Sequence, residues 1–356
     1  MIMDKKFFQG KRVLVTGHTG FKGSWLCTIL NVMGAEVIGY SLKPVHPSLY
    51  ELTGLEQKIC SIIGDIREFS RLKQVFIQKK PEIIFHLAAQ PIVRESYVNP
   101  RDTYEINVMG TVNLLECVRQ SRSVRSVVNV TTDKVYDNQE WEWGYRENDS
   151  LDGFDPYSNS KSCSELMTHS YKRAFLDTRR IPVSTMRAGN VIGGGDFAKD
   201  RIIPDCVRAM QSQRKIVVRN PYSVRPYQHV LEPLHAYLMV ACRQAVEPEC
   251  MGCFNVGPDE KDCITTGELV QLFCKEWGSE ASWETQSSDG CHEAGFLKLD
   301  CSKIKRRFNW KPVWDIEKAV EKTVEWTKVY MGKGSVCECM EKQLKEFWLD
   351  SSIWNH

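Results

Sequence analysis

The segment Thr16-Gly17-His18-Thr19-Gly20-Phe21-Lys22-Gly23 lies between a short apolar run that begins at Lys11 and a helical apolar pattern that ends at Gly34. This order predicts a strand, a glycine-rich turn and a helix. The spacing G-x-x-G-x-x-G is typical of dinucleotide binding: the first glycine permits the tight turn, the second lets backbone approach a pyrophosphate, and the third lets the helix pack on the strand. We therefore expect a dinucleotide phosphate at the start of this helix, the alternative being a tight turn without a ligand.

Alternating strand and helix patterns continue after this unit. They predict an α/β fold, a Rossmann-type doubly wound parallel sheet with a smaller mixed α/β substrate-binding lobe. The regular alternation is interrupted after Arg187, which sets the expected division of the chain. The expected parts are a dinucleotide-binding domain (1–188 with 229–257), a substrate-binding lobe (189–228 with 258–330) and a C-terminal tail (331–356), whose amphipathic segment near 340–348 is assigned to packing or oligomer contact.

A candidate reaction centre begins directly after the apolar run 127–130, where the chain reads Thr131-Thr132-Asp133-Lys134. Doubly wound sheets bind their ligands at the carboxyl ends of the strands, so a predicted strand that ends in polar groups indicates chemistry there. Tyr157 and Lys161 lie four residues apart, and on a helix this spacing puts both on one face, where the ammonium is expected to lower the pKa of the phenol. The predicted catalytic residues are Thr132, Asp133, Lys134, Tyr157 and Lys161, with a surface ion pair as the alternative for Asp133 and Lys134.

The cofactor site is expected to extend from the glycine turn to the ends of the neighbouring strands. Asp65 is placed to accept a hydrogen bond from an adenine amine, although a helix N-cap is the alternative. The second strand ends in Tyr40-Ser41-Leu42-Lys43, without the acidic residue that would bind a ribose 2′-hydroxyl, so this loop leaves NAD and NADP both open. The expected cofactor contacts are Gly17, Thr19, Gly20, Phe21, Lys22, Gly23, Asp65, Ile66, Leu87, Ala88, Ala89, Gln90, Thr131, Tyr157, Lys161 and Arg187.

Three arginines on separate elements after the predicted cofactor unit suggest a substrate that carries a pyrophosphate. Guanidinium groups bind such oxygens in pairs of hydrogen bonds, while solvation at the surface is the alternative for each of Arg201, Arg219 and Arg225. The expected substrate contacts are Gln90, Thr132, Asn190, Arg201, Arg219, Arg225, Gln228 and His229.

Composition excludes several other classes of function. Lys plus Arg number 47 and Asp plus Glu 45, a net charge of +2, which favours neither nucleic acid nor a membrane surface as a partner. No apolar run is long enough for a membrane span and the first residues do not resemble a signal peptide, so a cytoplasmic location is expected. The 14 cysteines are scattered as expected for reduced thiols, and Cys250-x-x-Cys253 lacks a second ligand pair, so no metal site is predicted.

The motifs together, with Arg225-Pro226-Tyr227-Gln228-His229-Val230, resemble those of the extended short-chain dehydrogenase/reductases that act on nucleotide sugars, over the chain to about residue 330. Asp133-Lys134 is similar to the CDP-glucose branch of the 4,6-dehydratases, whereas the dTDP-glucose branch carries Asp-Glu there. The resemblance implies a lyase with tightly held NAD that converts CDP-glucose to CDP-4-keto-6-deoxyglucose and water, in deoxysugar biosynthesis for lipopolysaccharide O-antigen. It also implies a homodimer formed through the helices 101–120 and 158–175.

The same resemblance implies roles for the reaction centre. Tyr157 takes the proton of the C4 hydroxyl and Thr132 hydrogen-bonds O4, while Asp133 and Lys134 serve the elimination across C5 and C6 as acid and base. The sequence leaves the assignment within that pair open, since Lys134 could also stabilise the enolate. The alternatives are a 4-epimerase, which has no use for an acid and a base beside C5 and C6, a 4,6-dehydratase of another nucleotide hexose, and a non-catalytic NAD(P)-binding sensor.

Overall fold

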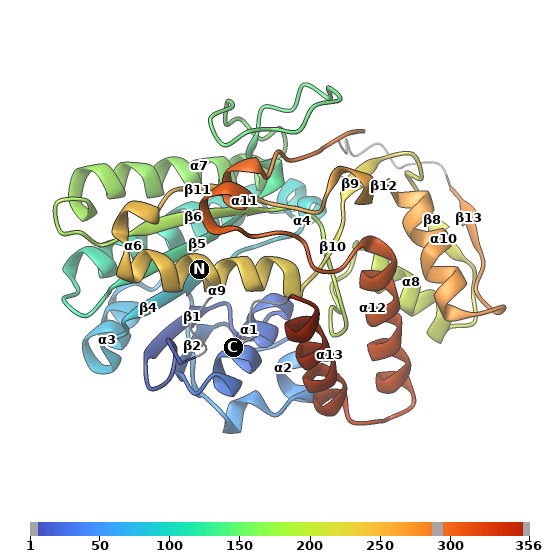
Figure 1. The fold of residues 1–356 in the computed structure, drawn as a ribbon, viewed down its shortest axis with the longest axis horizontal. Coiled ribbons are helices and arrows are strands. Elements are labelled where there is room, and N and C mark those ends of the chain that lie inside the picture. The colour runs from blue at the N-terminus through green and yellow to red at the C-terminus, as the bar shows by residue number, and fades with distance from the viewer. Residues whose placement is uncertain (1–5, 287–294, 352–356) are drawn as a thin grey trace.

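Seven parallel strands form the central sheet, in the spatial order β11-β6-β5-β4-β1-β2-β3 (Figure 1). The computed structural model describes residues 6–286 and 295–351. The direction of winding reverses between β1 and β4, and this is where doubly wound sheets bind ligands. The strands are β1 (Arg12–Thr16), β2 (Glu36–Ser41), β3 (Cys60–Ile63), β4 (Ile83–His86), β5 (Ser126–Thr132), β6 (Val183–Ala188) and β11 (Cys253–Val256). The predicted Rossmann-type fold is confirmed.

Helices cover both faces of this sheet, which explains why its central strands read as continuous apolar runs. Val13 and Val15 of β1 contact the core under α1 and α9, while Leu14 between them belongs to the core under α3 and α6. Figure 1 shows α9 lying across the front of the sheet. The helices of the two layers are α1 (Phe21–Val32) and α9 (Leu231–Val246) on one face, and α3 (Phe69–Lys79), α6 (Gly110–Gln120) and α7 (Pro156–Tyr171) on the other.

Residues after β6 build a smaller lobe, at the right of Figure 1, with a hydrophobic core of its own. Its sheets are three two-stranded pairs, β10 with β7, β12 with β9 and β13 with β8. The elements of the lobe are β7 (Val191–Ile192), α8 (Ile202–Gln211), β8 (Ile216–Val218), β9 (Val224–Pro226), β10 (Gln228–His229), β12 (Cys263–Thr265), α10 (Thr266–Trp277), β13 (Trp283–Thr285) and α12 (Ile316–Met331). The exact domain limits given above stay a prediction.

Several helices of the structure differ from the sequence-based expectation, and α2 (Leu49–Leu52) is one that was not expected at all. Arg201, which was expected on an element of its own, is the N-cap of α8, and this helix runs to Gln211. Pro204 is tolerated because it stands in the first turn, where a missing N–H breaks no helical hydrogen bond. A short helix, α4 (Val93–Val98), lies after β4 and before α5 (Pro100–Tyr104). A π-helical turn, Glu105–Met109, joins α5 to α6, so the expected helix 101–120 is nearly continuous.

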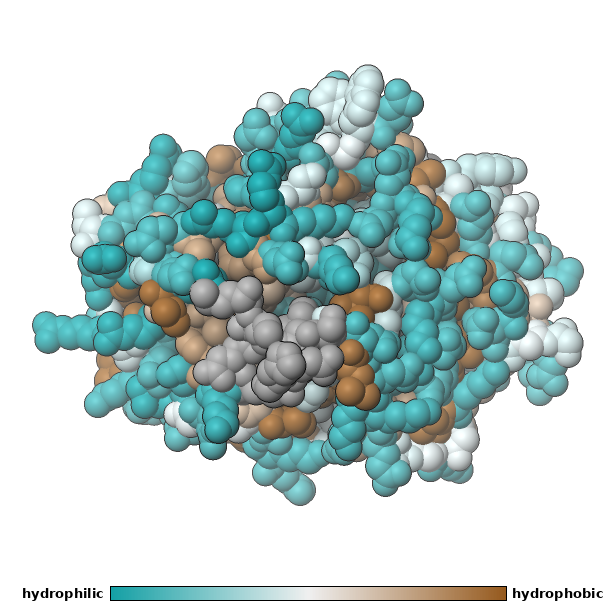
Figure 2. Space-filling model, viewed as in Figure 1, coloured by the Kyte–Doolittle hydropathy of each residue, from teal (hydrophilic) through white to brown (hydrophobic). Residues whose placement is uncertain are grey.

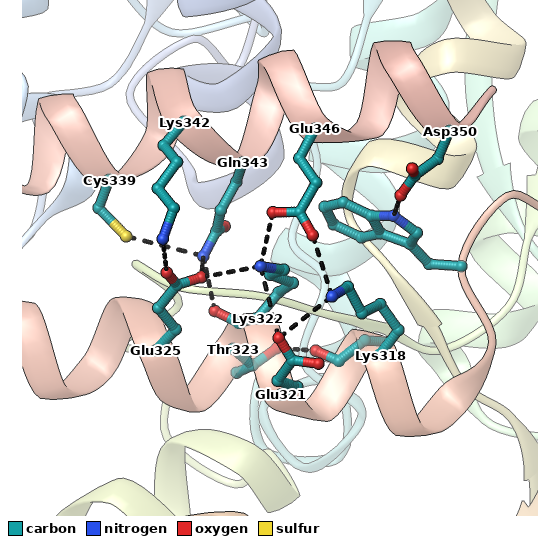
Figure 3. A network of polar contacts seen from close by, with 12 residues as sticks. Lys318, Glu321, Lys322, Thr323, Glu325, Cys339, Lys342, Gln343, Glu346 and Asp350 are labelled. Atoms are coloured by element: carbon teal, nitrogen blue, oxygen red, sulfur yellow. Dashed lines mark hydrogen bonds and ion pairs between the residues drawn. The ribbon is translucent and has the colours of Figure 1, made fainter. Parts of the chain in front are cut away.

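The tail forms one helix, α13 (Val336–Asp350), which packs on α12. Met340, Leu344 and Phe347 enter the main hydrophobic core, so this helix packs against the rest of the chain. Packing was one of the two roles expected for the tail. Charged residues join its polar side to α12: Lys322 Nζ lies 2.7 Å from Glu346 Oε2 and 3.2 Å from Glu325 Oε2 (Figure 3). The residues 352–356 of the expected tail lie outside the described residues.

The face of the molecule shown in Figure 2 is mostly hydrophilic, with hydrophobic residues in small separate groups. Within residues 6–286 and 295–351, no helix is long and apolar enough to cross a membrane.

Candidate active site

A cavity opens at the carboxyl ends of β5 and β6, between the sheet and the smaller lobe. Residues from both parts of the chain line it, including the three predicted arginines and four of the five predicted catalytic residues, all but Lys161. The lining residues with polar or charged side chains include Lys22, Arg94, Thr131, Thr132, Asp133, Lys134, Tyr157, Asn190, Asp196, Asp200, Arg201, Asp205, Arg219, Asn220, Ser223, Arg225, Tyr227 and Thr266.

The glycine turn has the local geometry that its spacing predicts. Gly17 has a φ of +75°, and a Cβ there would lie 2.8 Å from the backbone nitrogen of Ala88. A Cβ on Gly23 would overlap the Gly17 carbonyl, so the third glycine permits the helix to pack on the turn. Gly20 is the N-cap of α1, and neither a side-chain cap nor an acidic residue occupies this first turn. The backbone N–H groups at this helix start therefore fit a dinucleotide pyrophosphate.

The rest of the expected cofactor site lies around this turn. Thr19 Oγ1 donates to the Leu42 carbonyl at 3.0 Å, which ties the turn to the loop after β2. Gln90 lies outside the cavity lining, because its amide nitrogen donates to Thr103 Oγ1 at 2.9 Å and its backbone N–H to Asn107. The structure thus gives the Gln90 side chain partners within the protein instead of bringing it to the substrate cavity.

Asp65 does not cap a helix, because α3 has Glu68 at its N-cap. The carboxylate of Asp65 instead forms an ion pair with Arg67, 2.7 Å from its guanidinium, and this partner holds the pKa of Asp65 below its usual value. Ile66 is buried against Gly110, where no Cβ would fit. The N-cap alternative for Asp65 is wrong, and its contact with an adenine stays a prediction.

Asp133 lies at the end of β5 with its carboxyl group buried in the cavity wall. Oδ1 accepts a hydrogen bond from Thr132 Oγ1 at 3.0 Å, and Oδ2 has no hydrogen-bond partner among the described residues. Burial raises the pKa of this carboxyl, although the charge of Lys134 and the Thr132 hydrogen bond act in the opposite direction. Burial therefore shifts Asp133 toward its protonated form, the form that an acid in the reaction requires.

Tyr157 and Lys161 occupy the first two turns of α7, whose N-cap Asp155 accepts from the Ser158 backbone. Burial raises the pKa of Tyr157 to about 12, while a hydrogen bond with Thr132 lowers it. Lys161 Nζ donates to the Val130 carbonyl at 3.2 Å, and burial lowers its pKa to about 8. Desolvation dominates at the phenol, so the pKa of Tyr157 is raised overall, and the expected effect of Lys161 on it stays a prediction.

Arg187 is not part of the cavity, contrary to its expected contact with the cofactor. Its guanidinium lies 3.0 Å from Glu165 with both side chains 2% exposed, and it also donates to the Tyr136 hydroxyl. Thr131 and Thr185 donate to the same Glu165 carboxylate. Arg187 therefore belongs to a buried polar cluster between β6 and α7.

The expected substrate residues divide into two groups. Asn190, Arg201, Arg219 and Arg225 line the cavity, as predicted for residues that contact a substrate. Gln228 and His229 are outside its lining: the Gln228 amide donates to the Val256 carbonyl at 2.9 Å. The His229 ring packs between Trp25 and Trp314. The structure therefore does not bring Gln228 and His229 to the cavity, because both side chains are buried against these other parts of the protein.

Comparison with known proteins identifies the family. The profile described as GDP-mannose 4,6 dehydratase matches residues 14–323. The chain belongs to this GDP-mannose 4,6 dehydratase family. A CDP-glucose 4,6-dehydratase of Salmonella typhimurium is 46% identical over 353 residues, covering 97% of this chain and 98% of the relative.

Solved structures share the fold of this dehydratase family member at low sequence identity. A UDP-glucose 4-epimerase from Thermotoga maritima, crystallised with UDP-glucose, has a TM-score of 0.79 at 21% identity and covers 90% of this chain and 99% of its own. A dTDP-glucose 4,6-dehydratase from Bacillus anthracis in complex with NAD has a TM-score of 0.76 at 22% identity, with coverages of 92% and 100%. These two likenesses concern the fold.

Two cations of this family member face the cavity without having been predicted to do so. Lys22, expected to contact the cofactor, lines the substrate cavity, and burial lowers its pKa to about 8. Arg94 was not predicted at all and reaches the cavity from α4. Pro91 and Pro100 flank this short helix, so the sequence around Arg94 reads as a loop, and only its position after β4 indicated a functional role.

Proposed function

We propose that the chain is an NAD-dependent lyase that converts CDP-glucose to CDP-4-keto-6-deoxyglucose and water. The observation that carries this proposal is the placement of Asp133 and Lys134 in one cavity with Thr132 and Tyr157. A buried carboxyl with a raised pKa beside an amine supplies an acid and a base for an elimination. The choice of CDP-glucose follows from the Salmonella relative, which is 46% identical over nearly the whole chain.

The glycine turn and the residues around it would hold NAD, with the pyrophosphate at the N-terminus of α1. When bound, NAD supplies the acceptor that keeps the C4 hydride until its return to C6. The preference for NAD over NADP is supported by the family and not by the end of β2, which lacks an acidic residue.

Thr132 and Tyr157 are assigned to the oxidation at C4, where the Thr132 hydroxyl hydrogen-bonds O4 and the phenolate takes the proton of the C4 hydroxyl. A phenol with a pKa of about 12 is almost entirely protonated at neutral pH, so nearby positive charge has to favour the phenolate that acts as the base. Arg201 already acts in this direction, and Lys161 on the same helix is the second cation available.

Asp133 and Lys134 are assigned to the loss of water. The protonated Asp133 carboxyl donates its proton to the departing C6 hydroxyl, and its raised pKa keeps that proton available. Lys134 removes the C5 proton or stabilises the negative charge that develops on O4. Neither role has an equivalent in a 4-epimerase, which makes the product the deciding observation.

The proposal includes three broader properties. We assign the chain to the cytoplasm and to deoxysugar biosynthesis for lipopolysaccharide O-antigen, in keeping with the family resemblance. We also propose a homodimer through the helices α5 to α7. Exposed apolar side chains support this interface, since Met109 of the π-helical turn and Leu166 of α7 are each about half exposed.

A panel of nucleotide hexoses, each tested with NAD and with NADP, tests the proposal. We expect CDP-glucose with NAD to give a 4-keto-6-deoxy sugar, detected by its absorbance in alkali. An epimerised hexose would instead support the 4-epimerase, turnover of another hexose would change the substrate, and cofactor binding without turnover of any hexose would support a sensor.

A further inference from the structure

Asp200 joins two arginines across the edge of the cavity. Its Oδ1 lies 3.8 Å from Arg94 Nε and 3.5 Å from a terminal nitrogen of Arg219. Arg94 belongs to α4 at the carboxyl end of the central sheet, whereas Arg219 follows β8 in the smaller lobe. All three residues line the cavity, so one carboxylate connects its two walls.

Another acidic side chain of the cavity lining acts differently. Asp196 pairs with Arg201 at 2.9 Å and is largely buried, with its carboxylate 6% exposed. The Asp200 carboxylate is 38% exposed and its two ion-pair distances exceed those of a hydrogen bond. Its pairs are therefore weak and can be replaced at low cost.

The backbone of Asp200 is also unusual, with a φ of +58°. Aspartate and asparagine tolerate this left-handed conformation better than most residues, because their short polar side chains can hydrogen-bond locally. The conformation places the carboxylate toward Arg94 and Arg219, at a position where a negatively charged oxygen meets guanidinium groups from both walls.

We propose that Asp200 holds the place of a substrate phosphate and that Arg94 is a diphosphate-binding residue. When the diphosphate of a nucleotide sugar binds, its oxygens contact Arg94 and Arg219 in place of the Asp200 carboxylate, which moves toward solvent. Phosphate oxygens suit this exchange, since they carry more charge than a carboxylate and accept paired hydrogen bonds from guanidinium groups. The inference rests on the proposed function for the class of ligand, a nucleoside diphosphate sugar.

The test measures binding of CDP to the NAD-loaded full chain by calorimetry. In Asp200→Asn, which keeps a side chain suited to a positive φ, we expect CDP to bind about fivefold tighter, because a weak competing ion pair is lost. In Arg94→Gln we expect binding about tenfold weaker, because a charged hydrogen-bond donor is lost. Cytidine, which has no phosphate, should bind equally to all variants.

Glu284→Gln serves as the control, since Glu284 forms an exposed ion pair with Lys215 in the same lobe and outside the cavity lining. Unchanged or weaker CDP binding in Asp200→Asn would overturn the role of Asp200. Unchanged CDP binding in Arg94→Gln, or an equal loss for cytidine, would overturn the role of Arg94, and Arg94→Lys replaces this variant if it does not fold.

The same titrations distinguish a failure of the proposed function. If the wild type prefers another nucleoside diphosphate and the variants change its affinity as expected, the assignment of CDP-glucose fails and the inference stands. If CDP-glucose is dehydrated but the variants bind CDP like the wild type, the inference fails and the function stands.

Discussion

At Asp133, burial and charge pairing act in opposite directions on one carboxyl. Its oxygens lie in the cavity wall, where desolvation disfavours the ionised form, while Lys134 and the Thr132 hydroxyl favour it. Burial dominates, so the pKa is raised. The charge of Lys134 therefore opposes the effect of burial without reversing it, and the pKa of Asp133 is shifted in the direction that suits an acid.

Two substitutions should block the reaction at different steps. Tyr157→Phe removes the group that takes the C4 proton, so we expect hydride transfer to slow by about 10²–10⁴-fold. Lys134→Met leaves that group intact, so reduced cofactor should accumulate while the keto-deoxy product is lost. Single-turnover absorbance of the reduced cofactor, read beside product formation, separates the two. Normal cofactor reduction in Tyr157→Phe would show the phenol to be a bystander, and unchanged turnover in Lys134→Met would remove Lys134 from the elimination.

Single residues also mark the limit of what the sequence could predict. The glycine turn and the Thr132–Lys134 segment were found because short-range spacing determines their positions. The arginines at 201, 219 and 225 were found because they follow the predicted cofactor unit on separate elements. The contact predicted for Arg187 was wrong because β6 is buried on both faces. Its apolar and polar residues therefore do not alternate in a way that shows which face a side chain points to. Its true partner, Glu165, lies 22 residues away on α7.

At the scale of elements, the strand and helix order was predictable because each unit carries its own apolar period. The short elements were not, since α4 lies between prolines and the strands of the smaller lobe are two or three residues long. The packing role of α13 could be learned only from the structure: its charged face contacts α12, and its apolar face joins the main core.

The ion-pair network between α12 and α13 should stabilise the docking of α13. Lys322 is only 5% exposed, and its ammonium contacts Glu325 and Glu346 (Figure 3). Lys322→Met removes the cation that these carboxylates share, although each keeps a second lysine partner. We therefore expect a loss of about 2 kcal/mol in the free energy of unfolding and faster proteolysis near α13.

Lys342→Met is the matched control, since Lys342 contacts Glu325 in the same network but is 67% exposed. Its loss should cost less than about 1 kcal/mol. Equal destabilisation by the two variants in urea denaturation would contradict a special role for the buried lysine.

At the scale of the whole molecule, the proposed dimer follows from the helices on one face of the sheet. Leu166 of α7 and Met109 of the π-helical turn before α6 expose about half of their surface, and α6 and α7 are neighbours. Burying such side chains against a second copy would remove apolar area from water, and a twofold arrangement would bring the same helices of both chains together.

Leu166→Arg should therefore convert the dimer to a monomer, because it would place a guanidinium group without a partner in an apolar interface. Light scattering after size exclusion at micromolar protein measures the mass of the 41.0 kDa chain and of its dimer. Val246→Arg is the control, since Val246 is exposed at the end of α9 on the opposite face of the sheet and should leave the dimer intact. A dimer that persists in Leu166→Arg but dissociates in Val246→Arg would show that the interface lies on the α9 face. A monomeric wild type would refute the dimer itself.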